Sequence, residues 1–303
     1  MTFSKIAEGV FVVIGGSFPR CNTVVIIADE VVVIDPGCSV EDLRGFLMDQ
    51  NLDLRKIDTV ILSHIHPDHI IHTMRLNRLS GCRIAANEIT APLFNDKEEM
   101  KKFLGFHKGN PVRKLWEQLV NERMFGAFDE GRVDEVLKNG DTFGLGDITL
   151  KTLYTPGHLP DHMCIEIVEP NIIFASDLDL TEFGPYYGHP NSSIRDFKMS
   201  IRKVQHGKYD GLISGHLKDP LVLDYKDRLT AYSRQIGMRE DLVLSAILEG
   251  AHTIPEITAN PIIYPSLTNP VFLQFETWMI EHHVSSLLES GLVEEGKGKL
   301  KAT

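Results

Sequence analysis

The chain is organised around residues 63–69, which read Ser63-His64-Ile65-His66-Pro67-Asp68-His69. They follow the apolar, β-favouring run of residues 58–62 and precede residues 70–79, for which a helix is predicted. Three histidines and an aspartate therefore lie on the turn between a buried strand and a helix, where α/β folds bind ligands. Because imidazole and carboxylate groups bind first-row metals without any thiolate, the stretch predicts a metal site.

The spacing within this stretch divides its side chains into two groups. His64 and His66 are two residues apart, so an extended backbone points them the same way. Asp68 and His69 follow Pro67, which bends the chain, and we expect them to face a second point nearby. The alternative is a polar loop that is rich in histidine by chance. Four side chains that can bind metal, within six positions directly after a predicted strand, favour instead a set of ligands for two metal ions.

Three later turns carry more side chains of the same kinds. They read Thr155-Pro156-Gly157-His158, Phe174-Ala175-Ser176-Asp177 and Ser214-Gly215-His216. Each follows an apolar run that predicts a strand, and further strands are predicted at residues 9–14, 22–27, 31–34, 83–86 and 162–168. We therefore expect the metal-binding side chains to converge on one edge of the fold.

The pattern His64-x-His66-x-Asp68-His69, followed in order by these turns, resembles the signature of the metallo-β-lactamase-fold hydrolases over roughly residues 8–220. The resemblance implies an α/β (α+β) fold of two similar halves, packed as a four-layer αββα sandwich with the site at one rim. It does not name the substrate, because the family hosts many chemistries.

The resemblance also implies a complete ligand set. Metal one would be held by His64, His66 and His158, and metal two by Asp68, His69 and His216, with Asp177 bridging the two. Two divalent ions are therefore expected, with zinc as the default, although iron or manganese would accept the same ligands. This chain has Ile70-Ile71-His72 where the family usually has a small pair ending in glycine, and His72 and His162 are predicted to lie outside the ligand set.

Two cations a few Å apart lower the pKa of a bridging water toward neutrality, and the resulting hydroxide attacks the substrate. We expect Asp68 to orient that hydroxide. The Gly/Pro-rich loop of residues 183–190 follows Asp177, and a hydroxyl from Tyr187 would donate to the developing oxyanion, unless its aromatic residues only pack the loop onto the sheet. Asp35 also ends a strand, and it either orients a metal-bound histidine or bonds its own turn.

Two domains are predicted, a hydrolase domain at 1–223 and a helical unit at 224–303. Residues 87–139 form a charged, helical insertion without a strand pattern, which serves either as a lid or wall over the site or as a solvated decoration. The tail predicts helices at 228–248, 253–259 and 271–290 and a hairpin at 292–300, an order that looks like a winged helix. Residues 282–293 resemble the tail of the lactamase-like endoribonuclease subgroup. The resemblance therefore points to two subgroups of the family, this one and glyoxalase II.

Composition narrows the classes of partner. The chain of 303 residues has a formal net charge of −11, so its surface as a whole repels nucleic acid and anionic membranes. Its four cysteines are far apart, with no C-x-x-C pair, which favours free thiols in a reducing compartment. No apolar run approaches the roughly 20 residues that span a bilayer, and residues 1–5 show no leader pattern. We expect a soluble, cytoplasmic protein with a small-molecule substrate and no membrane or nucleic-acid partner.

The leading interpretation is a dinuclear hydrolase of a small ester, thioester or lactone. An endoribonuclease is the alternative that the tail favours, but residues 226–303 hold seven Lys/Arg and ten Asp/Glu, and phosphate binding needs a basic surface. A diiron flavoprotein is disfavoured, because it would carry a carboxylate where this chain has His66. A binding protein that has lost turnover is also disfavoured, because it would have no need to keep all seven ligands. The tail is expected to pack on the hydrolase domain, wall the pocket or form a homodimer contact.

Overall fold

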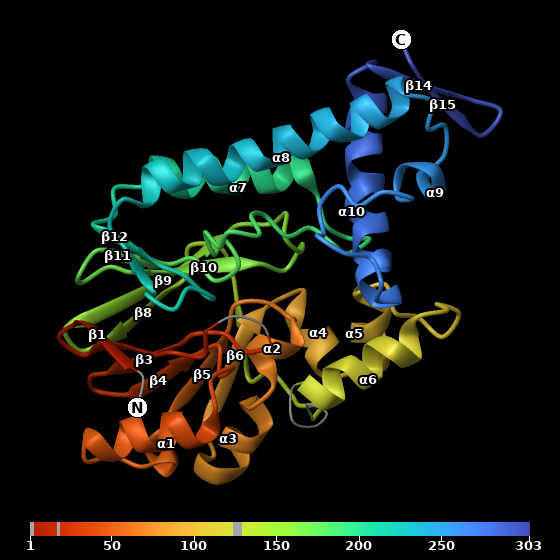
Figure 1. Cartoon of the computed structure of the whole chain (residues 1–303). Helices are drawn as coiled ribbons and strands as arrows, with labels where there is room; N and C mark the ends of the chain where they lie inside the picture. The colour runs from red at the N-terminus through yellow and green to blue at the C-terminus, as the bar shows by residue number, and fades with distance from the viewer. Residues whose placement is uncertain (1–2, 17–18, 124–128) are drawn as a thin grey trace.

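The computed structural model describes residues 3–16, 19–123 and 129–303, and Figure 1 shows their arrangement. The strands of the two large sheets are β1 (Phe3–Ala7), β2 (Val10–Val13), β3 (Thr23–Ile27), β4 (Val31–Ile34), β5 (Thr59–Leu62), β6 (Arg83–Asn87), β7 (Glu135–Leu137), β8 (Thr142–Leu145), β9 (Ile148–Tyr154), β10 (Met163–Ile167), β11 (Ile172–Phe174), β12 (Gly211–Ile213) and β13 (Leu221–Val222). The helices of the sandwich and its insertion are α1 (Val40–Asp49), a short 3₁₀ turn at Leu54–Lys56, α2 (Pro67–Ile70), α3 (Thr73–Ser80), α4 (Thr90–Phe94), α5 (Lys97–Phe103), α6 (Arg113–Arg123) and α7 (Ile194–His206).

The first sheet has the order β1-β2-β3-β4-β5-β6-β7. Strands β1 to β4 pair antiparallel, and β4 to β7 pair parallel. Helices α1 and α3 connect the parallel strands and cover the outer face of this sheet (Figure 1). Parallel strands need such crossovers, and their helices bury one face of the sheet.

The second sheet has the order β13-β12-β11-β10-β9-β8. Strand β11 pairs parallel with β12 across the α7 connection, and the other neighbours pair antiparallel. Helix α7 covers its outer face together with α8 (Tyr225–Leu248), as Figure 1 shows. Helices therefore lie outside both sheets, and the predicted four-layer αββα sandwich is confirmed.

The strands are apolar at successive positions because both of their faces are buried. In β3, Val24 and Ile26 point into the core between the sheets, whereas Val25 points toward α1. In β11, Phe174 joins the core between the sheets and Ile173 packs toward α7 and α8. This period of two explains why the sequence reads as continuous apolar runs rather than as alternating ones.

Three local expectations were wrong. The helix predicted at 70–79 is two helices, α2 and α3, because the chain turns at Ile71 and His72. The stretch 87–139 was predicted to lack strands, yet it contains β7, whose three residues are held by parallel pairing with β6. The short strands β1 and β8 were also not predicted. Short strands depend on a neighbour in the sheet more than on their own sequence.

Residues 224–303 contain α8, α9 (Ile254–Ile257), α10 (Pro270–Glu289) and a hairpin of β14 (Val293–Gly296) and β15 (Lys299–Ala302). This is the predicted order of helices and hairpin, although the domain boundary at residue 223 stays a prediction. Helix α8 packs on the sandwich at one end and extends beyond it, where it meets α9, α10 and the hairpin (Figure 1). The other end of α10 reaches the insertion helices. Among the described residues, no helix is long and apolar enough to cross a membrane.

Candidate metal centre

Strand β5 delivers the central motif. All four of its residues are buried, and the chain stays extended until His66, after which Pro67 begins α2. Proline suits the first turn of a helix because its missing N–H would have no helical partner there. The N–H of Ile65 donates to Asp161 Oδ2 at 2.8 Å, which fixes the backbone between the two leading histidines. His64 and His66 therefore point to the same side of the strand end.

The later ligand turns need glycine because other backbone lies against them. A Cβ added to Gly157, whose φ is +133°, would lie 2.1 Å from the backbone nitrogen of Phe197. A Cβ added to Gly215 would lie 2.6 Å from the carbonyl oxygen of Ser176. These close approaches pack the turns before His158 and His216 directly onto neighbouring segments.

Hydrogen bonds between the sheets bring the motifs to one rim. The N–H of Met163 in β10 donates to the Ser63 carbonyl at 3.1 Å. Asn22 donates its side-chain amide to the carbonyls of Ser214 and Leu217, at 2.9 and 2.8 Å, and its N–H to the Gly215 carbonyl at 2.6 Å. The last histidine turn is thereby tied to the start of β3.

One oxygen of the Asp177 carboxylate faces the first predicted ligand group. Asp177 Oδ2 lies 3.1 Å from His158 Nε2, 3.7 Å from His64 Nε2 and 3.7 Å from His66 Nδ1. His66 Nδ1 and His158 Nε2 are 2.9 Å apart. All four side chains are buried, and the four ligand atoms lie close enough together to hold one metal ion.

The other oxygen of Asp177 faces the second group. Asp177 Oδ1 lies 3.0 Å from His69 Nε2 and 3.2 Å from His216 Nε2. Asp68 Oδ2 completes this side, at 3.7 Å from His216 Nε2 and 4.0 Å from His69 Nε2. The structure thus brings together all seven side chains that the sequence predicted as ligands, in the two predicted groups. We call these seven side chains the metal cluster.

Each histidine of the cluster has one ring nitrogen that contacts protein and one that faces the aspartates. The protein contacts are His64 Nδ1 with Ser63 Oγ (2.9 Å), His66 Nε2 with His189 Nε2 (2.9 Å), His69 Nδ1 with Asp35 Oδ2 (2.8 Å), His158 Nδ1 with the Tyr186 carbonyl (2.8 Å) and His216 Nδ1 with the Arg20 carbonyl (3.1 Å). Metal-binding histidines are usually held in this way, because the outer contact fixes both the tautomer and the ring orientation.

Asp35 contacts the metal cluster rather than only its own turn. Besides His69, its carboxylate accepts hydrogen bonds from the Ser63 N–H at 2.7 Å, the Ser63 hydroxyl at 2.6 Å and the Ser176 hydroxyl at 3.2 Å. Asp35 and Ser176 both have positive φ values, +51° and +47°. Such backbone strain persists only where surrounding contacts fix it, and here both residues lie beneath the ligands.

The donor set fits divalent metal ions. His64 Nε2, His69 Nε2 and Asp177 Oδ1 are buried and have no hydrogen-bond partner among the described residues. A buried polar atom without a partner costs about 1–3 kcal/mol, and ligation of a cation would remove that cost. Imidazole nitrogens and carboxylate oxygens without thiolate match zinc, iron or manganese.

The electrostatics of the cluster also favour cations. Burial lowers the pKa of His216, but the charges of Asp177 and Asp68 outweigh burial and raise that pKa to about 9. Burial likewise opposes ionisation of Asp177, yet His69 and His158 hold its pKa well below the usual range. The carboxylates therefore create a strongly negative site that positive charge stabilises.

Sequence reasoning gave no role to His189, which the structure places against a predicted ligand. The Nδ1–H of His189 donates to the carbonyl of Leu104 at the end of α5, at 2.9 Å, so its Nε2 is left to accept the Nε2–H of His66. The Nδ1 of His66 is then the nitrogen that faces the cluster. His282 of α10 donates to the His189 carbonyl at 2.7 Å. No local sequence signal marked His189, since its partners come from distant segments.

A cavity of about 370 Å³ opens from the cluster. Asp68, Asp177 and His216 lie at one side of it, together with His66. Its other side, which we call the cavity wall, is formed by Trp116 and Leu119 of α6 and by Tyr264, Phe272 and Phe275 of the tail. The insertion and the tail therefore both form walls of the site. For each of them, this was one of the alternatives that the sequence left open.

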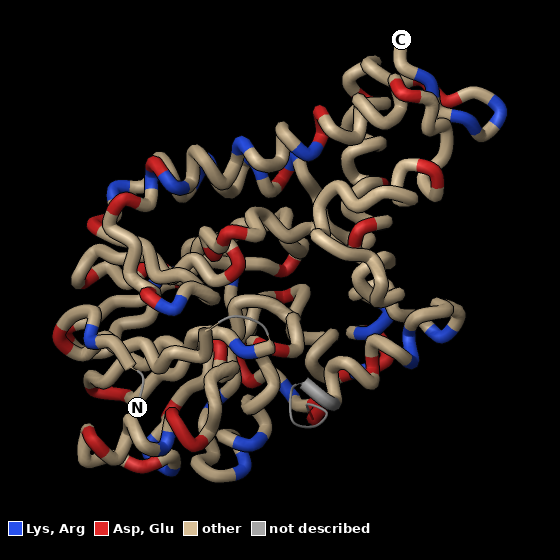
Figure 2. The backbone as a smooth tube through the Cα atoms, in the orientation of Figure 1, with Lys and Arg blue, Asp and Glu red and all other residues tan. Residues whose placement is uncertain are grey.

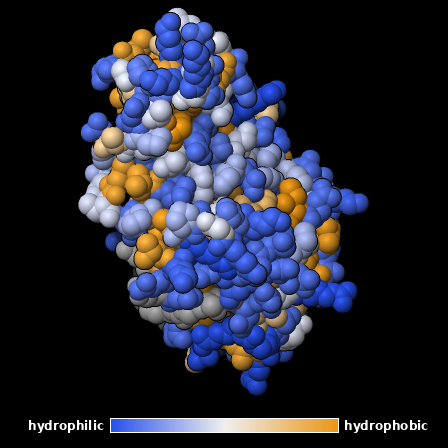
Figure 3. Space-filling view, turned by 90° about the vertical axis from the view of Figure 1, so that its right-hand side faces the viewer, coloured by the Kyte–Doolittle hydropathy of each residue, from blue (hydrophilic) through white to orange (hydrophobic). Residues whose placement is uncertain are grey.

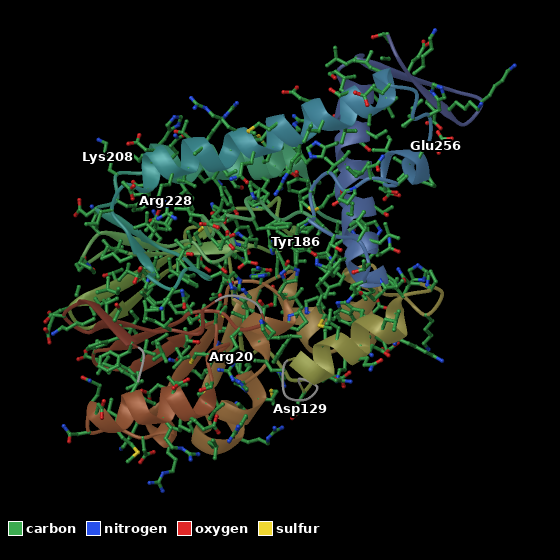
Figure 4. The ribbon with its side chains drawn as sticks, viewed as in Figure 1. Arg20, Asp129, Tyr186, Lys208, Arg228 and Glu256 are labelled. Atoms are coloured by element: carbon green, nitrogen blue, oxygen red, sulfur yellow. The ribbon has the colours of Figure 1, made fainter. Side chains whose placement is uncertain are left out.

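The catalytic assignment of Tyr187 was wrong. Tyr187 is fully buried, and its hydroxyl bonds to His283 Nε2 at 2.8 Å and accepts from Arg239 at 3.3 Å, away from the cavity. Its neighbour Tyr186 lines the cavity, and Figure 4 shows it between the sandwich and α10. The two side chains of an extended Tyr-Tyr pair point in opposite directions, and the sequence does not say which faces the site.

The remaining predictions concern side chains near the cluster. His162 is buried beside it, where its Nδ1 bonds to the Thr155 hydroxyl at 2.8 Å and its Nε2 accepts the Asp177 N–H at 3.2 Å. His72 precedes α3 and belongs to none of the metal-binding groups found among the described residues. All four cysteines are free and buried, as expected.

Comparisons with known proteins agree with this geometry. The sequence model of the metallo-beta-lactamase superfamily matches residues 17–216. A metallo-beta-lactamase fold-containing protein of Sulfurisphaera tokodaii is 25% identical over 243 residues, covering 74% of this chain and 84% of that protein. An atrochrysone carboxyl ACP thioesterase of Cryptosporiopsis sp. is 23% identical over 223 residues, covering 72% of this chain and 54% of the relative. The crystal structure of a metallo-beta-lactamase family protein from Thermus thermophilus superposes with a TM-score of 0.75 at 17% identity, over 99% of this chain and 100% of that one.

Proposed function

The chain belongs to the metallo-β-lactamase superfamily of hydrolases, and from this premise we propose that it is a dinuclear enzyme that cleaves a small ester, thioester or lactone. His64, His66 and His158 would hold one metal ion, Asp68, His69 and His216 the other, and Asp177 would bridge them. Zinc is the metal that we propose, because it accepts this mixed nitrogen and oxygen set in open catalytic sites.

The observation that carries the proposal is the position of the Asp177 carboxylate. Its two oxygens face two different groups of ring nitrogens, at 3.1 to 3.7 Å on one side and 3.0 to 3.2 Å on the other. A carboxylate that served a single metal would not need unpartnered nitrogens on both sides. A bridging carboxylate, in contrast, offsets the repulsion between two cations.

The chemistry follows from what the side chains can do. Two bound divalent ions would lower the pKa of a water between them and polarise the scissile carbonyl. Asp68 lies at the cavity and can accept a hydrogen bond from the attacking water, which orients it. Asp35 and His189 keep the ring nitrogens of His69 and His66 turned toward the metals. No serine or cysteine nucleophile is required, and the pKa of Cys21 is raised by burial to about 12.

The cavity supports a carbonyl substrate over a phosphodiester. Its lining includes no Lys or Arg among the described residues, whereas recognition of a phosphate backbone rests on such cations. Figure 2 shows acidic and basic residues interspersed along α8, with no continuous basic strip on the tail. A relative is named a thioesterase, which favours the same class of substrate. The endoribonuclease alternative gains support from the order of elements in the tail and from the resemblance of residues 282–293 to the tail of that subgroup.

Purified protein would test the proposal in two measurements. Elemental analysis after growth with added zinc should give about two equivalents of metal per chain. A panel of p-nitrophenyl esters, acyl thioesters, lactones and a phosphodiester should then show turnover of the carbonyl substrates, abolished by chelation and restored by zinc. A single equivalent would refute the dinuclear site, and turnover of the phosphodiester alone would favour the endoribonuclease.

A further inference from the structure

The cavity continues past the metal cluster into a space whose walls come from outside the sandwich. Residues of α6, of the loop after β11 and of the tail meet there, and the cavity wall defined above closes its far side. Figure 3, which looks onto the side of α6 and α10, shows a largely hydrophilic surface with separate hydrophobic patches. The apolar side chains of the wall line the cavity.

The charges of the cavity lie at one end. Three aspartates, Asp68, Asp177 and Asp179, line it beside the cluster, and the described residues of its lining include no Lys or Arg. The far side is made of aromatic and aliphatic groups. An anionic group bound there would lose its hydration without gaining a partner, which is unfavourable. An uncharged apolar group would gain free energy from the same environment.

Aromatic stacking and hydrogen bonds hold the wall in place. Tyr264 stacks on Phe272 with ring centroids 5.5 Å apart, and Trp116 stacks on Phe106 at 4.3 Å. The buried carboxylate of Glu276 accepts the N–H groups of residues 262, 263 and 264, at 2.8, 3.1 and 2.9 Å, and so fixes the segment that carries Tyr264. A cavity held open in this way needs no reorganisation to receive an apolar ligand.

We propose that this space is an acyl-binding site, which takes the uncharged aliphatic or aryl arm of the substrate while the carbonyl lies at the metal cluster. The proposal rests on the proposed function for the identity of the scissile group, but not for the binding of the apolar arm. It names the substrate class as esters or thioesters of medium-length apolar acids. It excludes acids that carry a second carboxylate at the far end of the acyl chain.

The first test is the dependence of kcat/KM on acyl length in the zinc-loaded, full-length protein. Between acetyl and octanoyl p-nitrophenyl esters, kcat/KM should rise by up to about fourfold for each methylene group buried. The octanoyl analogue with a carboxylate at its far end should be at least tenfold poorer than the octanoyl ester. A flat or falling profile, or equal turnover of the charged analogue, would overturn the acyl site.

Two variants of helix α6 test whether the dependence of kcat/KM on acyl length arises at the cavity wall. Leu119→Trp places bulk on the cavity wall and should lower kcat/KM for the octanoyl ester about tenfold, with the acetyl ester changed less than twofold. Leu115→Trp makes the same substitution at a side chain of α6 that is 45% exposed and does not line the cavity, and it should leave the profile unchanged. Equal effects of both variants would contradict the proposal. Phe272→Ala, which enlarges the cavity, should move the optimum toward longer chains and replaces Leu119→Trp if that variant does not fold.

A binding measurement separates this inference from the proposed hydrolysis. Medium-chain methyl ketones resemble the acyl part of an ester but cannot be hydrolysed. They should change the fluorescence of the protein, because Trp116, one of its two tryptophans, lines the cavity. Affinity that increases with chain length supports the acyl site even if no ester is turned over, in which case the proposed function alone fails. No saturable binding of the longest ketone would overturn the acyl site even if esters are hydrolysed.

Discussion

The metal cluster and the cavity wall differ in how they are built. The cluster lies at strand ends of both sheets, and contacts with residues of the sandwich, such as those of His69 with Asp35 and of His158 with the Tyr186 carbonyl, fix its histidine rings. The cavity wall comes from the insertion helix α6 and from the tail, and aromatic stacking holds it together. Polar hydrogen bonds require a particular geometry, whereas apolar packing tolerates substitution of similar volume. The comparison indicates that the reaction and the choice of substrate can be changed separately.

Loss of the bridging carboxylate should have the largest effect. Asp177→Asn keeps the volume of the side chain but removes the charge that faces both groups of histidines. We expect kcat to fall by on the order of 10² or more and the metal content to fall below two equivalents. Steady-state kinetics and elemental analysis would measure both, and circular dichroism should show an intact fold. A variant with wild-type turnover would contradict the bridging role of Asp177.

His189 tests whether the sandwich alone fixes the ligands. His189→Ala removes the acceptor for the Nε2–H of His66 and leaves the Leu104 carbonyl without its donor. Loss of such an outer contact typically costs 10–100-fold in metal affinity, which competition with a chelator would measure. His189→Gln, which can both donate and accept, should restore part of the affinity.

Asn191→Ala is the matched control for His189. Asn191 also joins the loop after β11 to the insertion, by donating to the Phe103 carbonyl at 2.7 Å, but no described contact links it to a ligand. The control should keep wild-type metal affinity. If both alanine variants lose metal equally, the effect comes from the loop and not from the ring of His66.

Glu276 tests the cavity wall without touching the cluster. Glu276→Gln replaces a carboxylate that accepts three backbone N–H groups, and the wall segment with Tyr264 should loosen. Hydrogen bonds to charged groups are worth about 1.5–3 kcal/mol, so thermal denaturation should show a lower Tm. KM for an apolar ester should rise severalfold while kcat and metal content stay unchanged. Glu281→Gln on the exposed side of α10 is the control and should change neither the Tm nor the KM.

The far end of the tail should matter least for catalysis. Leu300 belongs to a small apolar cluster formed by the ends of α8 and α10, α9 and the hairpin. Leu300→Ala should destabilise this cluster by about 2–5 kcal/mol, as core leucine truncations do, and should shift a local unfolding transition. kcat and KM should stay within twofold of wild type. A large change in kcat would show that the hairpin end of the tail acts on the cluster through α10.

The two regions also differ in how far the sequence predicted them. His64, His66, Asp68 and His69 lie within one turn, and their spacing alone separated two groups of ligands. The resemblance to a known family then supplied the later turns, and the structure brings all of them together. The cavity wall gave no comparable signal. Trp116 and Phe275 are more than 150 residues apart in the chain, and each reads as an ordinary apolar position on a helix.

Local patterns in the sequence indicate which residues follow a buried strand, because apolar runs and turn residues are local properties. These patterns placed the histidines and aspartates at strand ends, and the resemblance to a known family then implied the sandwich and the complete ligand set. Three outcomes could be seen only in the folded chain: Tyr186 rather than Tyr187 faces the cavity, Asp35 and His189 hold the ligand rings, and β7 joins the first sheet. Those outcomes depend on contacts between segments far apart in the chain, and the free energy of such contacts has no counterpart in local sequence patterns.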